Sequence, residues 1–253
     1  MSVSVDLSGR RVLVTGASSG IGAATCQSIV GCGGSVAMLA RRKERLDELQ
    51  GELGERAVGV RADVTDLDGL AAAIDEAAGA LGGIDAVISV AGKSMAGAIA
   101  TGTPQRWREL LDINLVGPLA TVRYALPHFP ATGRRDVVLV GSAGAVTPLP
   151  GVGIYSASKR GLRAAFDCMR LELATDGINA SYVMPGLFDT ETFSADSLVI
   201  DGPVPQNDIP LFAPGGSPGR PEVVADSIAY MLGLPDGAVI NEMLVRPTAE
   251  YHP

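Results

Sequence analysis

Cysteine, histidine and aromatic residues are scarce in this sequence. Its 253 residues include three cysteines, two histidines and 4% aromatics. Cys26, Cys32 and Cys168 are odd in number, widely spaced and outside any C-x-x-C pattern, so the sequence predicts neither a disulfide framework nor a zinc site. We therefore expect no bound metal and a reducing, cytoplasmic location.

Long apolar runs and an excess of positive charge are also missing. No run approaches the roughly 18 apolar residues that a membrane span needs, and the first residues lack the charged segment and apolar core of a signal peptide. The formal net charge is -8, whereas nucleic-acid binders concentrate Lys and Arg on one face. The sequence therefore favours an ordinary soluble protein, with neither a membrane nor a nucleic acid as partner.

Apolar, β-branched runs alternate with helical patterns along the chain, and 47% of the residues are hydrophobic. No hairpin signal such as Asn-Gly joins the runs, so the strands connect through right-handed crossovers. We predict one α/β domain over residues 1–253, a doubly wound, Rossmann-type parallel sheet of about seven strands with helices on both faces. Strands are expected at 12–15, 35–40, 57–60, 86–90, 137–140, 180–184 and 239–245, and helices at 21–29, 45–53, 67–80, 104–126 and 155–175.

Residues 187–221 break this rhythm, because they carry six prolines and little periodicity. A loop this long in a compact domain is usually functional or mobile. It follows the sixth expected strand, at the carboxyl edge where open α/β sheets bind their ligands. We expect it to be a substrate-binding loop that closes over the site.

A glycine-rich segment, Thr15-Gly16-Ala17-Ser18-Ser19-Gly20-Ile21-Gly22, runs from the first expected strand into the first helix. Gly16 permits the tight turn, Gly20 lets the backbone approach a pyrophosphate, and Gly22 lets the helix pack on the strand. The helix N-terminus then faces the anion. A lone glycine triplet is often only a turn, but its position in the first βαβ unit is that of a dinucleotide site.

Cations follow the second expected strand, in Arg41-Arg42-Lys43, where a NAD site would place Asp or Glu on the ribose hydroxyls. One interpretation is a solvated helix start. The other is that Arg41, with Arg42 or Ser18 sharing the contact, binds the 2′-phosphate that only NADP carries. The missing carboxylate and the added cation together predict NADP as the cofactor.

Tyr155 and Lys159 stand four residues apart, which places both on one helix face. An ammonium beside a phenol favours the tyrosinate, so we expect Lys159 to lower the pKa of Tyr155 and fit it for proton transfer. Such a pair alone is common on helix surfaces. Ser142 adds to it, because the glycine- and proline-rich loop after the fifth strand can fold this serine back toward the helix, where it can hydrogen-bond a carbonyl.

Together these motifs resemble those of the short-chain dehydrogenase/reductase family. The shared features cover nearly the whole chain and follow family order: the length, the 15–22 glycine motif, Asp63-Val64, Asn114, Ser142, Tyr155-Ser156-Ala157-Ser158-Lys159 and Pro185-Gly186. The resemblance implies an oxidoreductase that moves a hydride between NADP(H) and a carbonyl or alcohol.

The resemblance also implies catalytic roles. Tyr155 is the expected acid/base, Lys159 also holds the nicotinamide ribose, and Ser142 orients the carbonyl. Asn114 is expected to hold a water that links Lys159 to solvent.

The cofactor-binding residues that the resemblance implies are Gly16, Ser18, Ser19, Gly20, Ile21, Gly22, Arg41, Arg42, Asp63, Val64, Ala91, Gly92, Tyr155, Lys159, Pro185, Gly186, Phe188 and Thr190. Among them, Asp63 is expected at the adenine and Thr190 at the carboxamide. One departure stands beside this set: Ser89-Val90 replaces the Asn-Asn that is usual in the family, and none of the catalytic groups is lost with it.

Two expected helices, 104–126 and 155–175, carry more apolar positions than one buried stripe needs. Family members pair these helices across two-fold axes, so we expect a homotetramer, with a homodimer as the alternative.

Two other functions compete with this interpretation. Ser156-x-x-Lys159 matches the serine-lysine motif of acyl-transfer enzymes, but the Ser-Asp-Asn and Lys-Thr-Gly partners of that motif are missing. A regulator that senses NADP without turning it over would share the fold, although such proteins usually lose the tyrosine or the lysine. The two histidines, His128 and His252, are expected at the surface or in packing roles.

Overall fold

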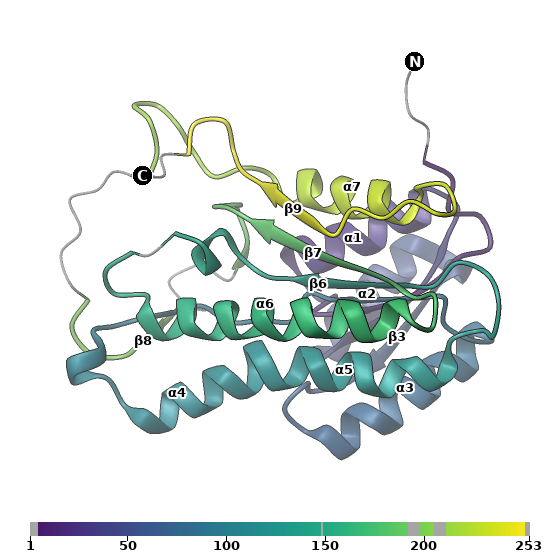
Figure 1. Ribbon diagram of the computed structural model, residues 1–253, viewed down its shortest axis with the longest axis horizontal. Coiled ribbons are helices and arrows are strands. Elements are labelled where there is room, and N and C mark those ends of the chain that lie inside the picture. Colours follow the sequence, from purple (N-terminus) through teal and green to yellow (C-terminus); the bar gives the residue numbers. More distant parts are fainter. Residues whose placement is uncertain (1–4, 148, 192–197, 205–210, 251–253) are drawn as a thin grey trace.

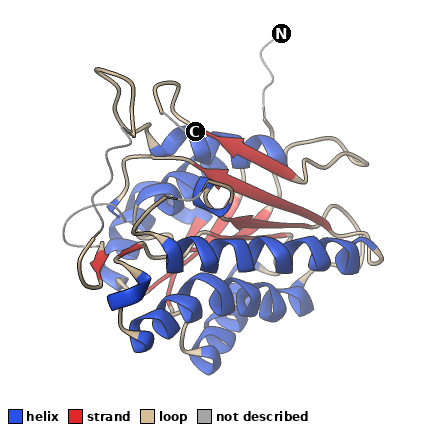
Figure 2. Ribbon diagram, turned by 60° about the vertical axis from the view of Figure 1, so that its left-hand side comes forward, coloured by secondary structure: helices blue, strands red, loops and turns tan. Residues whose placement is uncertain are grey.

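Seven parallel strands form one sheet in the computed structural model of the protein, which describes residues 5–147, 149–191, 198–204 and 211–250. The strands lie in the order β3-β2-β1-β4-β6-β7-β9 (Figures 1 and 2). All pairings within this sheet are parallel, so the predicted doubly wound, Rossmann-type fold is confirmed. The bounds are β1 Arg11–Thr15, β2 Ser35–Ala40, β3 Ala57–Arg61, β4 Ala86–Ser89, β6 Asp136–Val140, β7 Asn179–Pro185 and β9 Glu242–Val245.

The strand order reverses between β1 and β4. The chain builds outward from β1 to β3 and then returns to place β4 on the other side of β1. At such a reversal the connections leave the sheet on opposite faces, and a crevice opens at the carboxyl ends of the strands. The arrowheads of β7 and β9 point to the left in Figure 1, so this edge lies on that side.

Helices cover both faces of the sheet (Figure 1). One face packs against α1 (Gly20–Gly31), α2 (Lys43–Leu53) and α7 (Pro221–Leu232), and the other against α3 (Leu67–Leu81), α5 (Gly117–Ala125) and α6 (Gly153–Ala174). Successive strand residues alternate between the two cores, since Val12 and Val14 belong to the first and Leu13 to the second. Short turns η1 (Gly54–Arg56), η2 (Ile99–Thr101), η4 (Leu126–His128) and η5 (Ala143–Ala145) complete the connections.

The helix predicted at 104–126 is divided. It consists of α4 (Pro104–Leu111), a π-helical turn η3 (Asp112–Val116) and α5. A π turn adds one residue to the helical repeat and often occurs at functional sites. Asn114 lies in this turn and is fully buried.

Helix α7 is absent from the sequence-based prediction, which places no element between residues 221 and 239. Pro221 suggested a loop, yet it occupies the first helical turn, where its missing N–H costs nothing. The buried positions Val224, Ala225, Ile228 and Ala229 follow helical spacing and pack toward α1. Strand β9 begins at Glu242 rather than at residue 239.

The segment 187–221 is partly anchored. Its residues Val199–Ile200 form β8, which pairs in parallel with β5 (Met95–Ala96). Asp201 is 3% exposed and accepts hydrogen bonds from the Thr103 amide at 2.8 Å and the Trp107 indole at 3.2 Å. This part of the expected loop is therefore fixed to the start of α4, while 192–197 and 205–210 lie outside the described residues.

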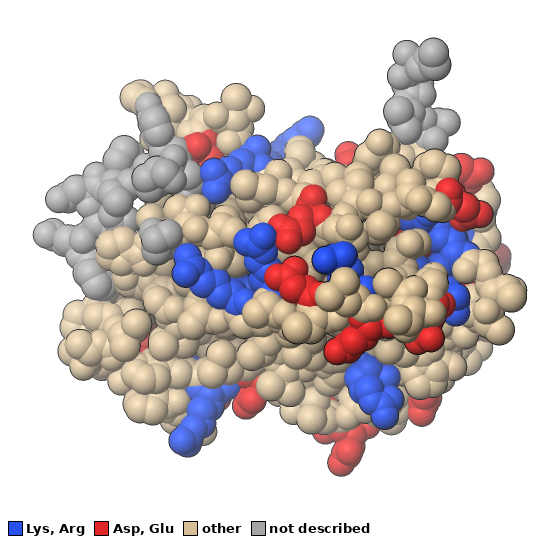
Figure 3. All heavy atoms as spheres, in the orientation of Figure 1, with Lys and Arg blue, Asp and Glu red and all other residues tan. Residues whose placement is uncertain are grey.

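Charged side chains of both signs are interspersed on the face shown in Figure 3. Lys and Arg do not form a broad area of their own there. None of the helices in the described ranges is both long and apolar enough to cross a membrane.

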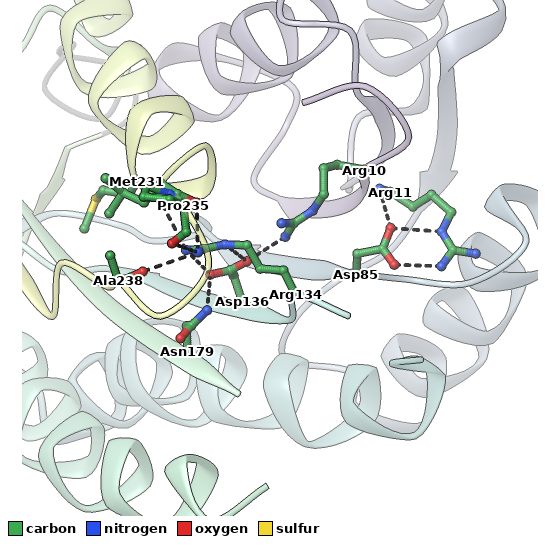
Figure 4. Close-up of polar contacts among 10 residues, drawn as sticks. Arg10, Arg11, Asp85, Arg134, Asp136, Asn179, Met231, Pro235 and Ala238 are labelled. Carbon is green, nitrogen blue, oxygen red and sulfur yellow. Dashed lines mark hydrogen bonds and ion pairs between the residues drawn. The ribbon is translucent and has the colours of Figure 1, made fainter. Parts of the chain in front are cut away.

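A buried polar network joins the amino ends of the strands, opposite the crevice (Figure 4). Asp136, at the start of β6, is 4% exposed and accepts hydrogen bonds from Arg10 at 2.6 Å, Arg134 at 3.0 Å and Asn179 at 3.1 Å. Arg134 also donates to carbonyl oxygens just beyond α7, those of Leu234, Pro235 and Ala238. One carboxylate thus ties β1, β6, β7 and the chain after α7 together.

Replacing this carboxylate should destabilise the fold. Asp136→Asn leaves two largely buried guanidinium groups without their counter-ion, so we expect a loss of roughly 3 kcal/mol in the free energy of unfolding. Urea denaturation measures it, with Asp75→Asn as the matched control, since Asp75 pairs with His128 at the surface and its side chain is 73% exposed. If Asp136→Asn lowers the free energy of unfolding no more than the control does, the network does not contribute to stability.

Candidate active site

A cleft of about 410 Å³ opens at the carboxyl ends of the central strands. The structure brings nearly all the predicted site residues to it, and only Asn114 lies outside its lining. The predicted residues that line it are Gly16, Ser18, Ser19, Gly20, Ile21, Gly22, Arg41, Arg42, Asp63, Val64, Ala91, Gly92, Ser142, Tyr155, Lys159, Pro185, Gly186, Phe188 and Thr190.

Two glycines of the motif, Gly16 and Gly22, leave no room for a side chain. A Cβ on Gly16, whose φ is +71°, would lie 2.8 Å from the Ala91 nitrogen, and one on Gly22 would lie 2.1 Å from the Gly16 oxygen. Helix α1 starts within this crowded turn, with no side-chain cap and no acidic residue in its first turn. Its first N–H groups are thus available to an anion such as a pyrophosphate, and the geometry suits a dinucleotide.

Ser142 and Tyr155 meet at the other end of the cleft. The Ser142 hydroxyl is fixed by accepting a hydrogen bond from the Gly144 amide at 3.0 Å. Burial raises the pKa of Tyr155, and hydrogen bonding to Ser142 and Ser94 offsets only part of that rise. The expectation that the pKa of Tyr155 lies below its ordinary value is therefore wrong in direction, because the loss of hydration outweighs the contributions that lower it.

Lys159 lies behind the tyrosine and is 4% exposed. Its ammonium donates to the Val140 carbonyl at 3.2 Å, and burial lowers its pKa to about 8. The Tyr182 hydroxyl donates to the Lys159 carbonyl at 3.0 Å and passes so close to Gly141 that a Cβ there would lie 2.1 Å from it. Strands β6 and β7 thereby hold α6, and Tyr155 with it, against the cleft.

Asn114 lies directly behind the cleft wall. Its amide brackets the backbone of Lys93, accepting from the nitrogen at 2.8 Å and donating to the oxygen at 2.9 Å, and it also donates to Ser158 at 3.1 Å. A Cβ on Gly92 would lie 3.3 Å from both the Asn114 oxygen and the Lys159 nitrogen. The Asn114 oxygen and the Lys159 nitrogen therefore both lie against Gly92, where there is no side chain to separate them.

The two arginines after β2 differ in their surroundings. The Arg41 side chain is 67% exposed, and its nearest carboxylate, Asp63, is 3.9 Å away. The Arg42 guanidinium donates to Ser19 at 2.8 Å and forms an ion pair with Glu191 at 2.8 Å. Arg41 is thus the arginine with room to meet a further anion.

Sequence reasoning missed three polar residues of the cleft lining, Lys93, Ser94 and Glu191. The first two follow the Ala91-Gly92 pair and were open to prediction from that position alone. Glu191 follows Thr190, but nothing in the sequence indicates its partner. Ser89, where the family usually has asparagine, is buried and lies 3.4 Å from the Thr15 hydroxyl.

The competing motifs fall outside the cleft. Ser156 does not line it, so the serine-lysine pair of an acyl-transfer enzyme is not assembled there. His128 contacts Asp75 at 2.9 Å and is also outside the lining, while His252 lies outside the described residues. Within the ranges that the structure describes, no three His, Cys, Asp or Glu side chains converge as metal ligands would.

Comparison with known proteins gives a consistent result. Residues 10–198 match the model of the short chain dehydrogenase family. Over 252 residues the chain is 32% identical to a glycine betaine reductase of Emericella nidulans; the match covers 96% of this chain and 19% of that longer protein.

Solved structures are similar over almost the full chain. A dehydrogenase/reductase from Sinorhizobium meliloti has a TM-score of 0.83 and 30% identity, with 96% of each chain covered. A short chain dehydrogenase from Burkholderia cenocepacia, in complex with NADP, has a TM-score of 0.79 and 28% identity, covering 95% of this chain and 96% of that one. The family match over more than half of the chain, on a sheet of the same architecture, shows that this protein belongs to the short-chain dehydrogenase/reductase family of oxidoreductases.

Proposed function

We propose that this protein is an NADP(H)-dependent oxidoreductase that transfers a hydride between the nicotinamide and a carbonyl or alcohol. The observation that carries the proposal is the convergence of Ser142, Tyr155 and Lys159 at one end of a cleft whose other end presents Arg41. A regulator without turnover would not need the first three groups. The complex of the Burkholderia cenocepacia relative with NADP supports the choice of cofactor.

The chain's residues divide the work of binding. The N-terminus of α1 and the bare backbone at Gly16 and Gly20 suit the pyrophosphate. Arg41 offers a guanidinium fork for the 2′-phosphate, and Asp63 lies beside it toward the adenine position. Lys159 is assigned to the nicotinamide ribose, with Phe188 and the Pro185-Gly186 turn beside the ring. The family resemblance implies a carboxamide contact for Thr190, but its side chain lies against Gly20 at the start of α1, so we assign it to the pyrophosphate.

The catalytic groups act on one substrate oxygen. When bound, the nicotinamide supplies or accepts the hydride. In reduction, Tyr155 donates its phenolic proton to the carbonyl oxygen while Ser142 donates a hydrogen bond to the same atom as negative charge develops on it. In oxidation the tyrosinate takes the proton back from the alcohol. The raised pKa of Tyr155 keeps the phenol protonated at neutral pH, which suits it to act as an acid.

Asn114 and Lys159 support this chemistry from behind. The resemblance to the family implies a water held by Asn114. The side-chain amide is already bonded to Lys93 and Ser158, so we assign Asn114 first as the residue that positions the Gly92-Lys93 turn against Lys159.

Assembly, location and loop closure are also part of the proposal. Val116 in η3 is 40% exposed and Leu171 on α6 is 61% exposed, so each of the two helical spans leaves a large apolar side chain at the surface that a second copy can cover. We propose a homotetramer or a homodimer in the cytoplasm, in which segment 187–221 closes over the substrate.

Tyr155→Phe should abolish turnover while leaving cofactor binding nearly intact. The change removes the proton donor but keeps the ring, so kcat should fall roughly a hundred- to ten-thousand-fold. Steady-state rates over a panel of small carbonyls with NADPH measure the fall, and NADPH fluorescence titration checks binding. Tyr230→Phe on α7, outside the cleft lining, is the control. Rates within a factor of a few of the unmodified protein would refute the role of Tyr155.

The two reaction directions should respond differently to pH. Because burial raises the pKa of Tyr155, the phenol stays protonated through neutral pH and the tyrosinate fraction grows as pH rises toward that pKa. We expect kcat/KM for alcohol oxidation to increase from about pH 7 to about pH 9, and kcat/KM for carbonyl reduction not to increase. Pre-equilibrated assays in both directions test this, and an oxidation rate that falls over the same range contradicts it.

Arg41→Asp should reverse the cofactor preference. Charge-assisted hydrogen bonds to the 2′-phosphate are worth about 1.5 to 3 kcal/mol, so NADPH should lose roughly ten- to a hundredfold in kcat/KM. The new carboxylate can accept hydrogen bonds from the ribose hydroxyls of NADH, which moves the ratio further the same way. The measurement is the ratio of kcat/KM for the two cofactors at fixed salt. Arg45→Asp, on α2 but outside the cleft lining, is the matched control, and an unmoved ratio in Arg41→Asp rules out this role for Arg41.

A further inference from the structure

Two chain segments that are remote in the sheet meet at the glycine motif. Arg42 follows β2 and Glu191 follows β7, and the sheet places β1, β4 and β6 between these strands. At about 4.8 Å per strand, the ends of β2 and β7 lie roughly 19 Å apart. The Arg42 Nη1 and Glu191 Oε2 atoms are nevertheless 2.8 Å apart. The chain after β7 therefore runs across the carboxyl edge of the sheet to the start of α2.

The Arg42 guanidinium is engaged on all three of its nitrogens. Nε donates to the Ser18 hydroxyl at 3.2 Å, Nη2 donates to the Ser19 hydroxyl at 2.8 Å, and Nη1 faces Glu191. Because all three guanidinium nitrogens make contacts, Arg42 joins three segments: the glycine motif, the start of α2 and the chain after β7. Arg41 in contrast pairs with one carboxylate among the described residues, that of Asp63 at 3.9 Å.

Thr190 lies on the N-terminus of α1. A Cβ added to Gly20, the first residue of that helix, would be 3.1 Å from the Thr190 side chain. The next residue, Glu191, is held in its charged form, since hydrogen bonding to Arg42 lowers the pKa of its carboxyl. Residues 190 and 191 thus cover the helix end at which a pyrophosphate would sit.

We propose that Glu191 and Arg42 form a clasp across the cofactor groove, which holds Thr190 over the pyrophosphate position and slows the release of either dinucleotide. This proposal rests on the proposed function, because the ligand that the clasp retains is the dinucleotide. It gives the two arginines separate roles, with Arg41 distinguishing NADPH from NADH and Arg42 retaining both. Glu191 is then a positioning residue that acts through Arg42.

Release rates test the clasp. Glu191→Gln and Arg42→Gln should each release NADPH and NADH about two- to fivefold faster, as expected for a half-exposed ion pair. The double variant should be no faster than the faster single one, because both changes break the same contact. Stopped-flow displacement followed by nicotinamide fluorescence measures these rates. Glu222→Gln is the matched control, since Glu222 borders the same segment at the start of α7 and its loss should leave both rates unchanged.

Three outcomes would overturn the proposal. Release rates unchanged in Glu191→Gln would show that the pair has no role. Release of NADPH, but not of NADH, that is slower in Glu191→Gln than in the unmodified protein would show that Glu191 competes with the 2′-phosphate for Arg42. Additive effects in the double variant would show that the two residues act separately.

Hydrogen exchange separates failure of the clasp from failure of the proposed function. Without any dinucleotide, amides of residues 187–191 should exchange faster in Glu191→Gln and Arg42→Gln than in the unmodified protein and in Glu222→Gln. If the unmodified protein binds neither dinucleotide, the proposed function fails, and the exchange rates alone decide whether the segment is clasped. Equal exchange in all four proteins would overturn the clasp even where both dinucleotides bind.

Discussion

The contact between the glycine motif and its neighbours is the constraint on which the rest of the site depends. Gly16 approaches Ala91 and Gly22 approaches Gly16 so closely that neither position admits a Cβ. Because β1 and β4 are adjacent at the strand-order reversal, this contact fixes the end of α1 relative to the Ala91-Gly92 turn. Gly92 in turn brings Asn114 to Lys159. Backbone packing thus sets the distance between the two ends of the cleft before any charged group contributes.

Electrostatics then divides the cleft into an interior and a rim. In the interior, burial raises the pKa of Tyr155 and lowers that of Lys159, so both groups are shifted toward their neutral forms. At the rim, the Arg41 side chain is 67% exposed to solvent. A group that exchanges protons with a substrate and a group that attracts a phosphate need these opposite surroundings, and one continuous cleft provides both.

The sequence predicted those features that depend on local spacing. The strands and their parallel, doubly wound arrangement followed from apolar runs that alternate with helical patterns, and the dinucleotide role of the glycine motif followed from its place between a strand and a helix. The π turn at Asn114 escaped prediction because one inserted residue barely disturbs an apolar repeat. Helix α7 was missed because Pro221 and the β-branched residues obscure its helical spacing. The direction of the Tyr155 pKa shift was missed because it depends on burial, which only tertiary packing determines. The Arg42–Glu191 contact joins residues that only the folded sheet brings together.

The buried network around Asp136 lies at the amino edge of the sheet, a whole strand away from the cleft. A strand of five residues spans roughly 17 Å, and substitutions that far apart have nearly independent effects on stability. The carboxyl-edge loops can therefore accumulate changes in shape and polarity without weakening the ion pairs that hold the strands together. A new substrate preference can arise in such a protein by drift in the loops, while the opposite edge preserves the scaffold.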